Sequence, residues 1–281
     1  MPKVVSLSRH AGNLVRSILF LFLLAAALPV SAGAHLSAEQ SARLSALADS
    51  AQWHALLHYN PATLLERSGT SQVDDSAFFL ATNGQQDPLA ELHATLDAFY
   101  QPAQNPDQHA VCRFPARWHW LSAELSLPPA PVALAQCTEL NTWLNAIQPH
   151  SITLIFASSY LNSPSSMFGH TFLRIDPANI ASGSDWLSYA VNFGAEYRPQ
   201  DNSLLYAWKG IFGGYPGFFS LLRYHEKINE YNRIENRDLW EYQLNLTPAE
   251  VKLLVSHLWE LRDTNFDYYF FDENCSYRLL E

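Results

Sequence analysis

The sequence predicts an α+β fold in which a helical N-terminal region precedes a core built on β-strands. Two observations support this prediction. In residues 35–148, apolar residues recur at helical spacing behind capping residues, whereas residues 149–281 contain short stretches that alternate apolar and polar residues as half-buried strands do. The pattern changes near Pro149, so we place the boundary between the two regions there.

The first 34 residues have the layout of a secretory signal peptide. Basic residues precede an apolar run over residues 18–30, and small residues up to Ala34 follow it. The run is too short for a comfortable membrane-spanning helix, and no later stretch approaches the ~20 apolar residues that such a helix needs. We therefore expect cleavage after Ala34 and export of the remaining chain.

The composition is that of a packed globular protein, because 48% of the residues are hydrophobic and 13% are aromatic. The net charge of -10 at pH 7 argues against a nucleic-acid partner, since phosphate binding requires a basic surface. It argues equally against purely electrostatic attachment to anionic lipid.

Helices are predicted from start signals and from apolar spacing. In the N-terminal region the predicted helices span about residues 37–49, 53–59, 87–99 and 137–147. The strongest signal lies further on, where Thr247 precedes a proline and Glu250 completes a capping box. We expect a helix from there to about Leu261.

Strands are predicted where apolar residues form short runs or alternate with polar ones. These stretches are residues 152–157, 170–176, 186–193 and 239–246. Between the last two, residues 209–217 are rich in glycine and aromatic residues and indicate a loop, and residues 224–236 indicate a charged helix.

The three cysteines divide into a pair and a single residue. Cys112 and Cys137 lie in the same segment of a chain that we expect to be exported, whereas Cys275 is distant in sequence. We predict a disulfide between Cys112 and Cys137 and a free thiol at Cys275. The alternative is that all three are buried thiols.

Cys275 is a candidate nucleophile. It follows the aromatic run 266–271 and precedes a predicted helix that Asp272 or Asn274 caps, so the helix N-terminus favours its thiolate. Thiol chemistry also needs a base, and we assign His170 to that role. The alternatives are a structural buried thiol at Cys275 and a core histidine at His170.

A third group is needed to orient the base. Asn192 lies in the predicted strand that follows the strand of His170, and Asp176 is the second candidate. The other histidines lack the spacing of paired metal ligands, so we expect neither a metal ion nor a cofactor.

Substrate contacts are predicted in two loops. Ser159 and Tyr160 precede His170 and line the cleft or donate to an oxyanion in this interpretation. In the second loop, Phe212, Tyr215 and Phe218 suit an apolar ligand or a membrane interface. Plain core packing is the alternative for these aromatic residues.

The second loop also suggests a lid. We expect residues 211–219 to cover an acyl chain held near Cys275 and thereby to shield a thioester from water. Lys209, at the start of the loop, either meets a lipid phosphate as a single positive charge or is simply solvated.

Several long motifs carry a family resemblance over about residues 115–281. They are residues 158–161, 167–174, 192–195, 209–217, 235–241 and 270–277. These motifs resemble the N-terminal periplasmic domain of the Lnb lipoprotein N-acyltransferase family. The order of a histidine in an early strand and an Asn-Cys pair at a late helix start is similar to the circularly permuted papain-like NlpC/P60 superfamily, which includes lecithin:retinol acyltransferase-like enzymes.

The resemblance implies a circularly permuted papain-like catalytic core with an antiparallel sheet in residues 149–281. It implies a thiol acyltransferase in the periplasm, with Cys275 as nucleophile and His170 as base. The acyl donor would be a phospholipid or lipoprotein ester, and the acceptor a lipoprotein N-terminus. The role of Asn192 is our own assignment from strand order and not part of the resemblance.

A cysteine peptidase or amidase of the cell envelope is the alternative enzyme, and a binding module without catalysis is a third hypothesis. The chain stops at Glu281, six residues after Cys275 and inside the predicted helix. We therefore expect it to be a fragment of a longer protein, with membrane association through the regions beyond.

Overall fold

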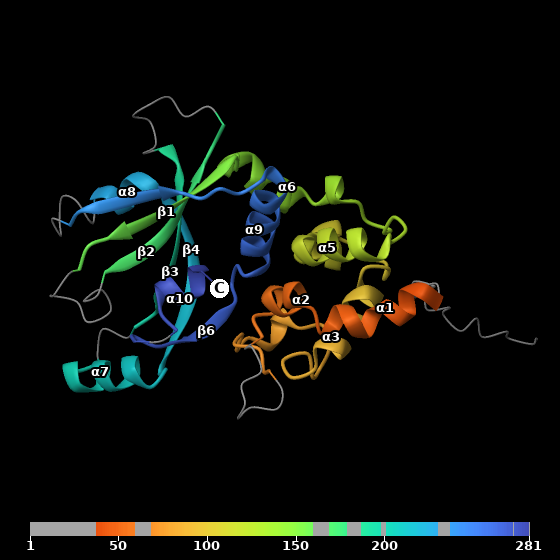
Figure 1. The fold of residues 1–281 in the computed structure, drawn as a ribbon, viewed down its shortest axis with the longest axis horizontal. Helices are drawn as coiled ribbons and strands as arrows, with labels where there is room; N and C mark the ends of the chain where they lie inside the picture. Colours follow the sequence, from red (N-terminus) through yellow and green to blue (C-terminus); the bar gives the residue numbers. More distant parts are fainter. Residues whose placement is uncertain are drawn as a thin grey trace, which may run out of the picture. The chain divides into compact units, whose positions relative to one another are not determined.

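The computed structural model describes residues 38–59, 69–159, 169–178, 187–197, 201–229, 237–271 and 273–280, which all belong to one structural unit (Figure 1). The predicted signal peptide lies outside these described residues. Within them, no helix has the length and apolar character needed to cross a lipid bilayer.

The predicted helical N-terminal region is confirmed. Its helices are α1 (Ala38–Ala48), α2 (Ala51–Leu56), α3 (Pro88–Ala98), α4 (Ala110–Arg113), α5 (Pro115–Leu125) and α6 (Thr138–Ile147), with 3₁₀ turns η1 (Ser76–Phe78), η2 (Pro106–Gln108) and η3 (Leu134–Gln136). At the start of α3, Asp87 Oδ1 accepts the Ala90 N–H at 2.9 Å, which agrees with the predicted start of a helix near residue 87. Helices α4 and α5 were not predicted.

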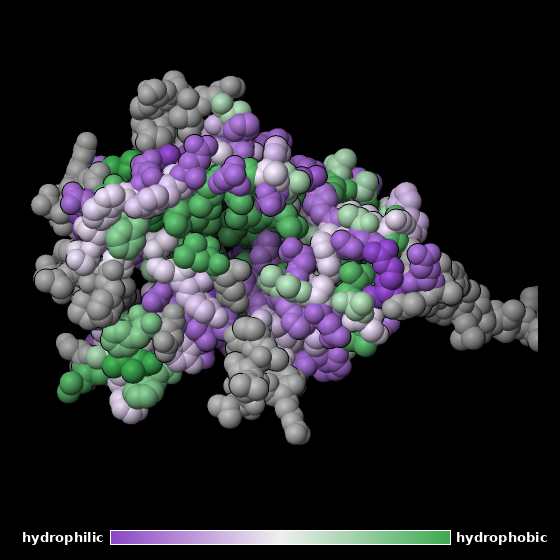
Figure 2. Space-filling model, in the orientation of Figure 1, coloured by the Kyte–Doolittle hydropathy of each residue, from purple (hydrophilic) through white to green (hydrophobic). Residues whose placement is uncertain are grey.

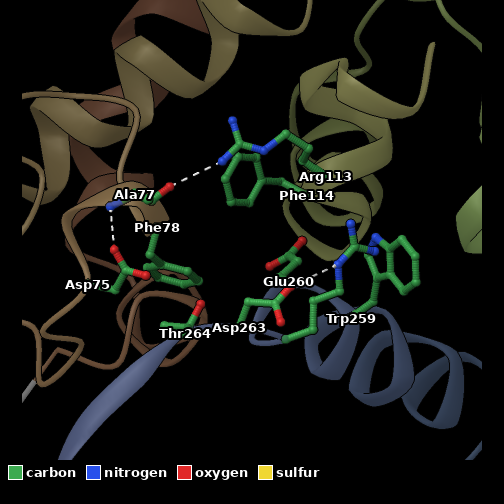
Figure 3. A pocket seen from close by; sticks show the side chains of 10 residues that line it. Asp75, Ala77, Phe78, Arg113, Phe114, Trp259, Glu260, Asp263 and Thr264 are labelled. Carbon is green, nitrogen blue, oxygen red and sulfur yellow. Dashed lines mark hydrogen bonds and ion pairs between the residues drawn. The ribbon is translucent and has the colours of Figure 1, made fainter. Parts of the chain in front are cut away.

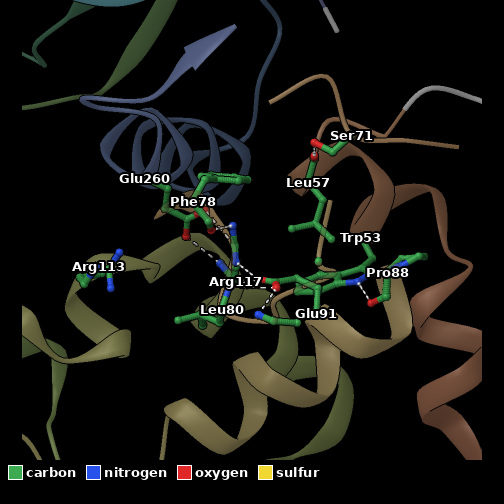
Figure 4. A network of polar contacts seen from close by, with 12 residues as sticks. Trp53, Leu57, Ser71, Phe78, Leu80, Pro88, Glu91, Arg113, Arg117 and Glu260 are labelled. Carbon is green, nitrogen blue, oxygen red and sulfur yellow. Dashed lines mark hydrogen bonds and ion pairs between the residues drawn. The ribbon is translucent and has the colours of Figure 1, made fainter. Parts of the chain in front are cut away.

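A buried ion-pair network joins this region to the core. Arg117 is fully buried, and its Nη1 donates to Glu91 Oε1 at 2.7 Å (Figure 4). Glu260, at the end of α9 (Pro248–Glu260), accepts the backbone N–H groups of Ala116 at 2.6 Å and Arg117 at 3.0 Å. Because a buried charge is costly unless it is paired and hydrogen-bonded, this network fixes α3, α5 and α9 to one another.

The predicted disulfide is also confirmed. Cys112 in α4 is bonded to Cys137, which immediately precedes α6, and their Cα atoms lie 5.3 Å apart. The backbone carbonyl of Cys112 accepts a hydrogen bond from Trp259 Nε1 at 2.8 Å, so the same segment is attached to α9.

The core is built on a six-stranded sheet in which all neighbouring strands are antiparallel. The strands are β1 (Ser151–Ala157), β2 (His170–Asp176), β3 (Tyr189–Ala195), β4 (Tyr215–Arg223), β5 (Leu239–Gln243) and β6 (Asn265–Tyr268). Their order is β5-β1-β2-β3-β4-β6. The predicted α+β class is therefore confirmed at the level of an antiparallel sheet preceded by a helical region.

Strand β2 is buried along its whole length because both faces of the sheet are covered. On one face Leu173 and Ile175 belong to an apolar cluster with Val251 and Val255 of α9. On the other face Phe172 belongs to a cluster with Tyr224, the first residue of α8 (Tyr224–Ile228). The capping box of Thr247 and Glu250 at the start of α9 is present as predicted.

The predicted loop over residues 209–217 is wrong. Helix α7 (Ser203–Ile211) runs through its first part, and β4 starts at Tyr215. A Cβ atom at Gly210 would collide with the Phe270 ring, and Gly213 has a φ of 73° in the short turn between helix and strand. These glycines therefore serve close packing and a tight turn, and a lid spanning residues 211–219 is wrong as well.

Three further predictions need correction. The charged helix predicted over residues 224–236 ends at Ile228 as α8, and residues 230–236 lie outside the described part. The strand predicted over residues 239–246 ends at Gln243 and is mostly exposed, because β5 is an edge strand. Strand β6 was missed, since we interpreted the aromatic run 266–271 only as the segment that precedes the helix of Cys275.

Candidate active site

Cys275 is the first residue of α10 (Cys275–Leu280), and its side chain is buried with 3% of its surface exposed. Asn274 Oδ1 accepts the N–H groups of Ser276 at 3.0 Å and Tyr277 at 3.4 Å, so Asn274 caps this helix. The other predicted cap, Asp272, lies outside the described residues. Helix α10 packs along β2, where Thr171 Oγ1 lies 2.7 Å from Ser276 Oγ.

The structure brings Cys275, His170 and Asn192 together. The Cys275 thiol is hydrogen-bonded to the imidazole of His170, which is the first residue of β2. His170 Nε2 lies 2.5 Å from Asn192 Oδ1 on β3. Because Asn192 occupies Nε2, the nitrogen that faces the sulfur is Nδ1. The imidazole is therefore held between the thiol and an acceptor that favours the tautomer protonated at Nε2.

The environment of Cys275 lowers its pKa below the ordinary value of 9.0. Burial by itself raises the pKa, because it disfavours the thiolate. The hydrogen bond and positive charge of His170 outweigh that effect, with further hydrogen bonds from the Thr171 backbone N–H and the Ser276 hydroxyl. This is the electrostatic setting of a reactive thiol rather than of an inert buried one.

Tyr268 at the end of β6 is a neighbour of Cys275 that sequence reasoning missed. Burial, followed by the negative charge of the Cys275 thiolate, raises the pKa of the Tyr268 phenol. Thr171 and Ser276 were missed too, although each is adjacent in sequence to a predicted catalytic residue. The signal available in the sequence was that Thr171 directly follows His170 and Ser276 directly follows Cys275.

Asp176, the second candidate for orienting the base, binds other residues and not His170 in these hydrogen bonds. Its carboxylate accepts hydrogen bonds from Thr153 Oγ1 at 2.7 Å, Arg174 Nε at 2.7 Å and Ser188 Oγ at 3.0 Å. Asp176 and His170 occupy opposite ends of β2, about 20 Å apart at the ordinary rise of a strand.

Of the first predicted substrate loop, only its start is described. Ser159 is exposed and follows β1 two residues after Ala157, the register partner of His170. It therefore lies at the same end of the sheet as the imidazole. Tyr160 lies outside the described residues.

The residues of the second predicted loop hold helix α7 and strand β4 together. Lys209 Nζ lies 2.8 Å from Asp201 Oδ2, and the Tyr215 hydroxyl donates to the same oxygen at 2.7 Å. Phe218 is half-buried in β4 and faces Gly194 and Asn265 on the neighbouring strands. Lys209, Tyr215 and Phe218 thus make contacts within the protein. The sequence analysis had predicted contacts with substrate for these residues.

Helix α7 presents large apolar side chains to solvent. The exposed residues are Leu204, Leu205, Trp208, Ile211 and Phe212. Trp208 and Phe212 pack against each other with ring centroids 4.3 Å apart, and 62% and 59% of their surfaces are exposed. Tyr206 of the same helix packs against Phe270, five residues before Cys275. We call these five exposed residues the α7 apolar surface.

The described residues show no metal-binding group, and one cavity among them is separate from this site. No group of three or more His, Cys, Asp or Glu side chains there is arranged to hold a metal ion. A cavity of about 170 Å³ lies between η1, α4 and the end of α9, where Figure 3 shows Asp75, Arg113 and Glu260 around it. Its lining includes none of the site residues named above.

Comparison with known families gives two matches. Residues 139–281 match the family model described as the Lnb N-terminal periplasmic domain. Residues 45–124 match a second model, described as a domain of unknown function, DUF7843. No curated protein and no solved structure matches the chain.

Proposed function

We propose that this chain, which belongs to the family of Lnb N-terminal periplasmic domains, is a thiol acyltransferase of the periplasm. It moves a fatty acyl chain from a lipid ester to the N-terminal cysteine amine of bacterial lipoproteins. The observation that carries the proposal is the contact of the buried Cys275 thiol with His170, whose far nitrogen is held by Asn192.

The first half-reaction forms a thioester. His170 Nδ1 takes the thiol proton, and the Cys275 thiolate attacks the ester carbonyl of the donor. The tetrahedral intermediate then collapses, the carbon–oxygen ester bond breaks, and the leaving alcohol takes the proton back from His170. The acyl group remains on the sulfur, and no outside oxidant or reductant is needed.

The second half-reaction repeats these steps with an amine as the nucleophile. The amine attacks the thioester carbonyl, His170 accepts the amine proton, and the thiolate leaves and takes that proton back as the thiol. Asn192 Oδ1 keeps the imidazole oriented in both halves by accepting the Nε2–H. An amide is the product, and Cys275 returns to its starting state.

The arrangement of elements supports a circularly permuted papain-like core. The base lies on β2, its partner Asn192 lies on the adjacent β3, and the nucleophile starts a helix that follows both in the chain. Helix α10 packs on the same central strand that carries the base.

A cysteine peptidase or amidase would use the same three residues, so the choice of substrate needs its own support. The lid predicted over residues 211–219 no longer supplies it. The α7 apolar surface does, because aromatic and aliphatic side chains exposed together are typical of a lipid or membrane interface. Family membership points in the same direction.

The experiment is mass spectrometry of a lipoprotein N-terminus from cells that carry either the wild-type protein or the Cys275→Ser variant. A serine hydroxyl is far less acidic than a thiol, so His170 is not arranged to ionise it. Acylated N-termini are expected with the wild type alone. If both cells show the same acylated N-terminus, the proposed activity is wrong; if neither does, but a cell-wall peptide is cleaved, the hydrolase is correct.

A further inference from the structure

A second cavity lies next to α10, the helix that begins at Cys275. Its volume is about 230 Å³, and residues of α2, α9, α10 and the sheet line it. The apolar side chains around it include Leu56, Leu173, Phe219, Leu254, Leu258 and Leu279. Figure 2 shows apolar surface gathered in a hollow in the middle of the molecule, over α9 and α10.

Two elements place this cavity close to the sulfur of Cys275. Leu279 follows Cys275 by four residues, so both side chains lie on one face of α10, about 6 Å apart along its axis. On β2, Leu173 follows Thr171 by two residues, or about 7 Å. The Thr171 N–H donates to the sulfur. The positions of Leu279 and Leu173 both put the nearest wall of the cavity about one helical turn from the nucleophile.

A groove next to α2 and α10 is lined by Ser276, the residue that follows the nucleophile. Ser276 and Leu280 of α10 line this groove together with His54 and Tyr59. Ala55 lines both the groove and the cavity. The two spaces therefore approach each other at Ala55 of α2.

Three of the polar side chains around the cavity, those of His58, His257 and Arg278, make hydrogen bonds to other protein groups. His58 Nε2 lies 3.0 Å from His257 Nε2, and His257 Nδ1 lies 3.1 Å from Glu260 Oε2. Arg278 donates to Gln72 and Glu273. Most of the remaining lining consists of leucine, phenylalanine and alanine side chains, against which an apolar ligand would replace water.

We propose that this cavity binds the carboxyl-proximal part of the fatty acyl chain while its carbonyl lies at Cys275. The inference rests on the proposed acyltransferase function and adds the acyl site, with α2 of the N-terminal region as one wall. An apolar cavity of about 150 Å³ accommodates a benzene molecule, so 230 Å³ accommodates roughly nine carbon atoms. A longer chain extends into the groove.

The test is the dependence of Cys275 acylation on chain length. The purified chain is incubated with p-nitrophenyl acetate or p-nitrophenyl octanoate, and kcat/KM for acyl-enzyme formation is measured. Each buried methylene raises kcat/KM by up to about fourfold, so octanoate is expected to exceed acetate by a large factor.

The variant Ala55→Phe fills the junction of cavity and groove, and its ratio of octanoate to acetate is expected to fall toward one. Ala46→Phe is the matched control, because Ala46 is exposed on α1 and lines neither space; it should keep the wild-type ratio. Leu254→Trp fills the cavity from α9, with Lys252→Trp as its exposed control on the same helix. Thermal unfolding of each variant checks that it is folded.

The possible failures are distinguishable. Equal acylation by both esters in the wild type, or a full octanoate preference in folded Ala55→Phe and Leu254→Trp, would overturn the acyl cavity and leave the acyltransferase standing. Such a result is expected if another segment of the protein fills the cavity. No acylation of Cys275 by either ester would overturn the proposed function together with this inference.

Discussion

His170 Nε2 lies 2.5 Å from Asn192 Oδ1, and the two residues come from neighbouring strands of the sheet. Leu173 pairs with Val191, so the continued register puts Asn192 opposite Phe172. His170 is the next residue along β2 on the same face, and diagonal neighbours of this kind are within reach of one another. The sheet register thus sets the orientation of the imidazole.

From this contact we predict that Asn192→Ala lowers the rate of Cys275 acylation by up to about 100-fold, since a small misplacement of a catalytic group has an effect of that size. His170→Ala removes the base itself and should cost about 10²- to 10⁴-fold. Single-turnover acylation kinetics measure both. Asn192→Asp keeps an acceptor oxygen and should retain more activity than Asn192→Ala; equal losses in the two would rule out the orienting role.

The second prediction concerns the pH dependence of the thiol. Because the folded-state pKa of Cys275 lies below 9.0, alkylation by iodoacetamide should reach half its maximal rate below pH 9.0. In His170→Ala the midpoint should move upward, since burial still raises the pKa while the hydrogen bond and charge of His170 are lost. An unchanged midpoint would show that His170 does not act on the thiol.

The same shift has a consequence for stability. A group whose pKa is lower in the folded state stabilises that state most at pH values above its unfolded pKa, and the contribution is lost as pH falls through the folded value. The stability difference between the wild type and Cys275→Ser should therefore shift in favour of the wild type from neutral pH toward pH 9. Denaturant unfolding at several pH values measures it.

The buried ion-pair network of Arg117 predicts a large effect on the free energy of unfolding at residues outside the candidate active site. Glu91→Ala leaves the Arg117 guanidinium buried without its 2.7 Å partner and should lower the free energy of unfolding by about 3–5 kcal/mol. The control is Glu124→Ala, which breaks an exposed pair with Arg43 and should cost less than about 1 kcal/mol. Similar losses for both variants in denaturant unfolding would contradict a stabilising role for the buried Glu91–Arg117 pair.

The α7 apolar surface predicts membrane binding. Trp208→Ser should weaken binding to phosphatidylcholine vesicles by about tenfold or more, because a large apolar side chain is lost from the contact. Trp240→Ser is the matched control, since Trp240 is also exposed but lies on the edge strand β5. Vesicle co-sedimentation gives the answer, and equal binding by the two variants would exclude α7 as the contact.

Local signals predicted the helical region, the capped helices α3 and α9, and the strands β1 to β3, because capping residues and short-range periodicity determine these elements. They did not predict β4 or the course of residues 209–217. Gly210 is required because a Cβ atom there would collide with the ring of Phe270, and Gly213 adopts a positive φ in a tight turn. The contact between Gly210 and the distant Phe270 leaves no local pattern in the sequence.

The candidate site could be predicted only for residues whose chemical type and place in the chain both indicate a catalytic role. Cys275, His170 and Asn192 were selected as residue types that act together, and the sheet brings them within contact. Tyr268, the α7 apolar surface and the Leu173–Leu279 cavity depend on how strands and helices pack, so the sequence alone did not reveal them.

The central claim is that Cys275 carries the acyl group during the reaction. The most direct measurement is the intact mass of the purified chain after incubation with a palmitoyl phospholipid in mixed micelles. We expect a single palmitoyl adduct that neutral hydroxylamine removes, as it does from a thioester, and that is absent from Cys275→Ser and His170→Ala. An adduct that persists in Cys275→Ser, or a wild-type chain that hydrolyses the lipid without any adduct, would contradict it.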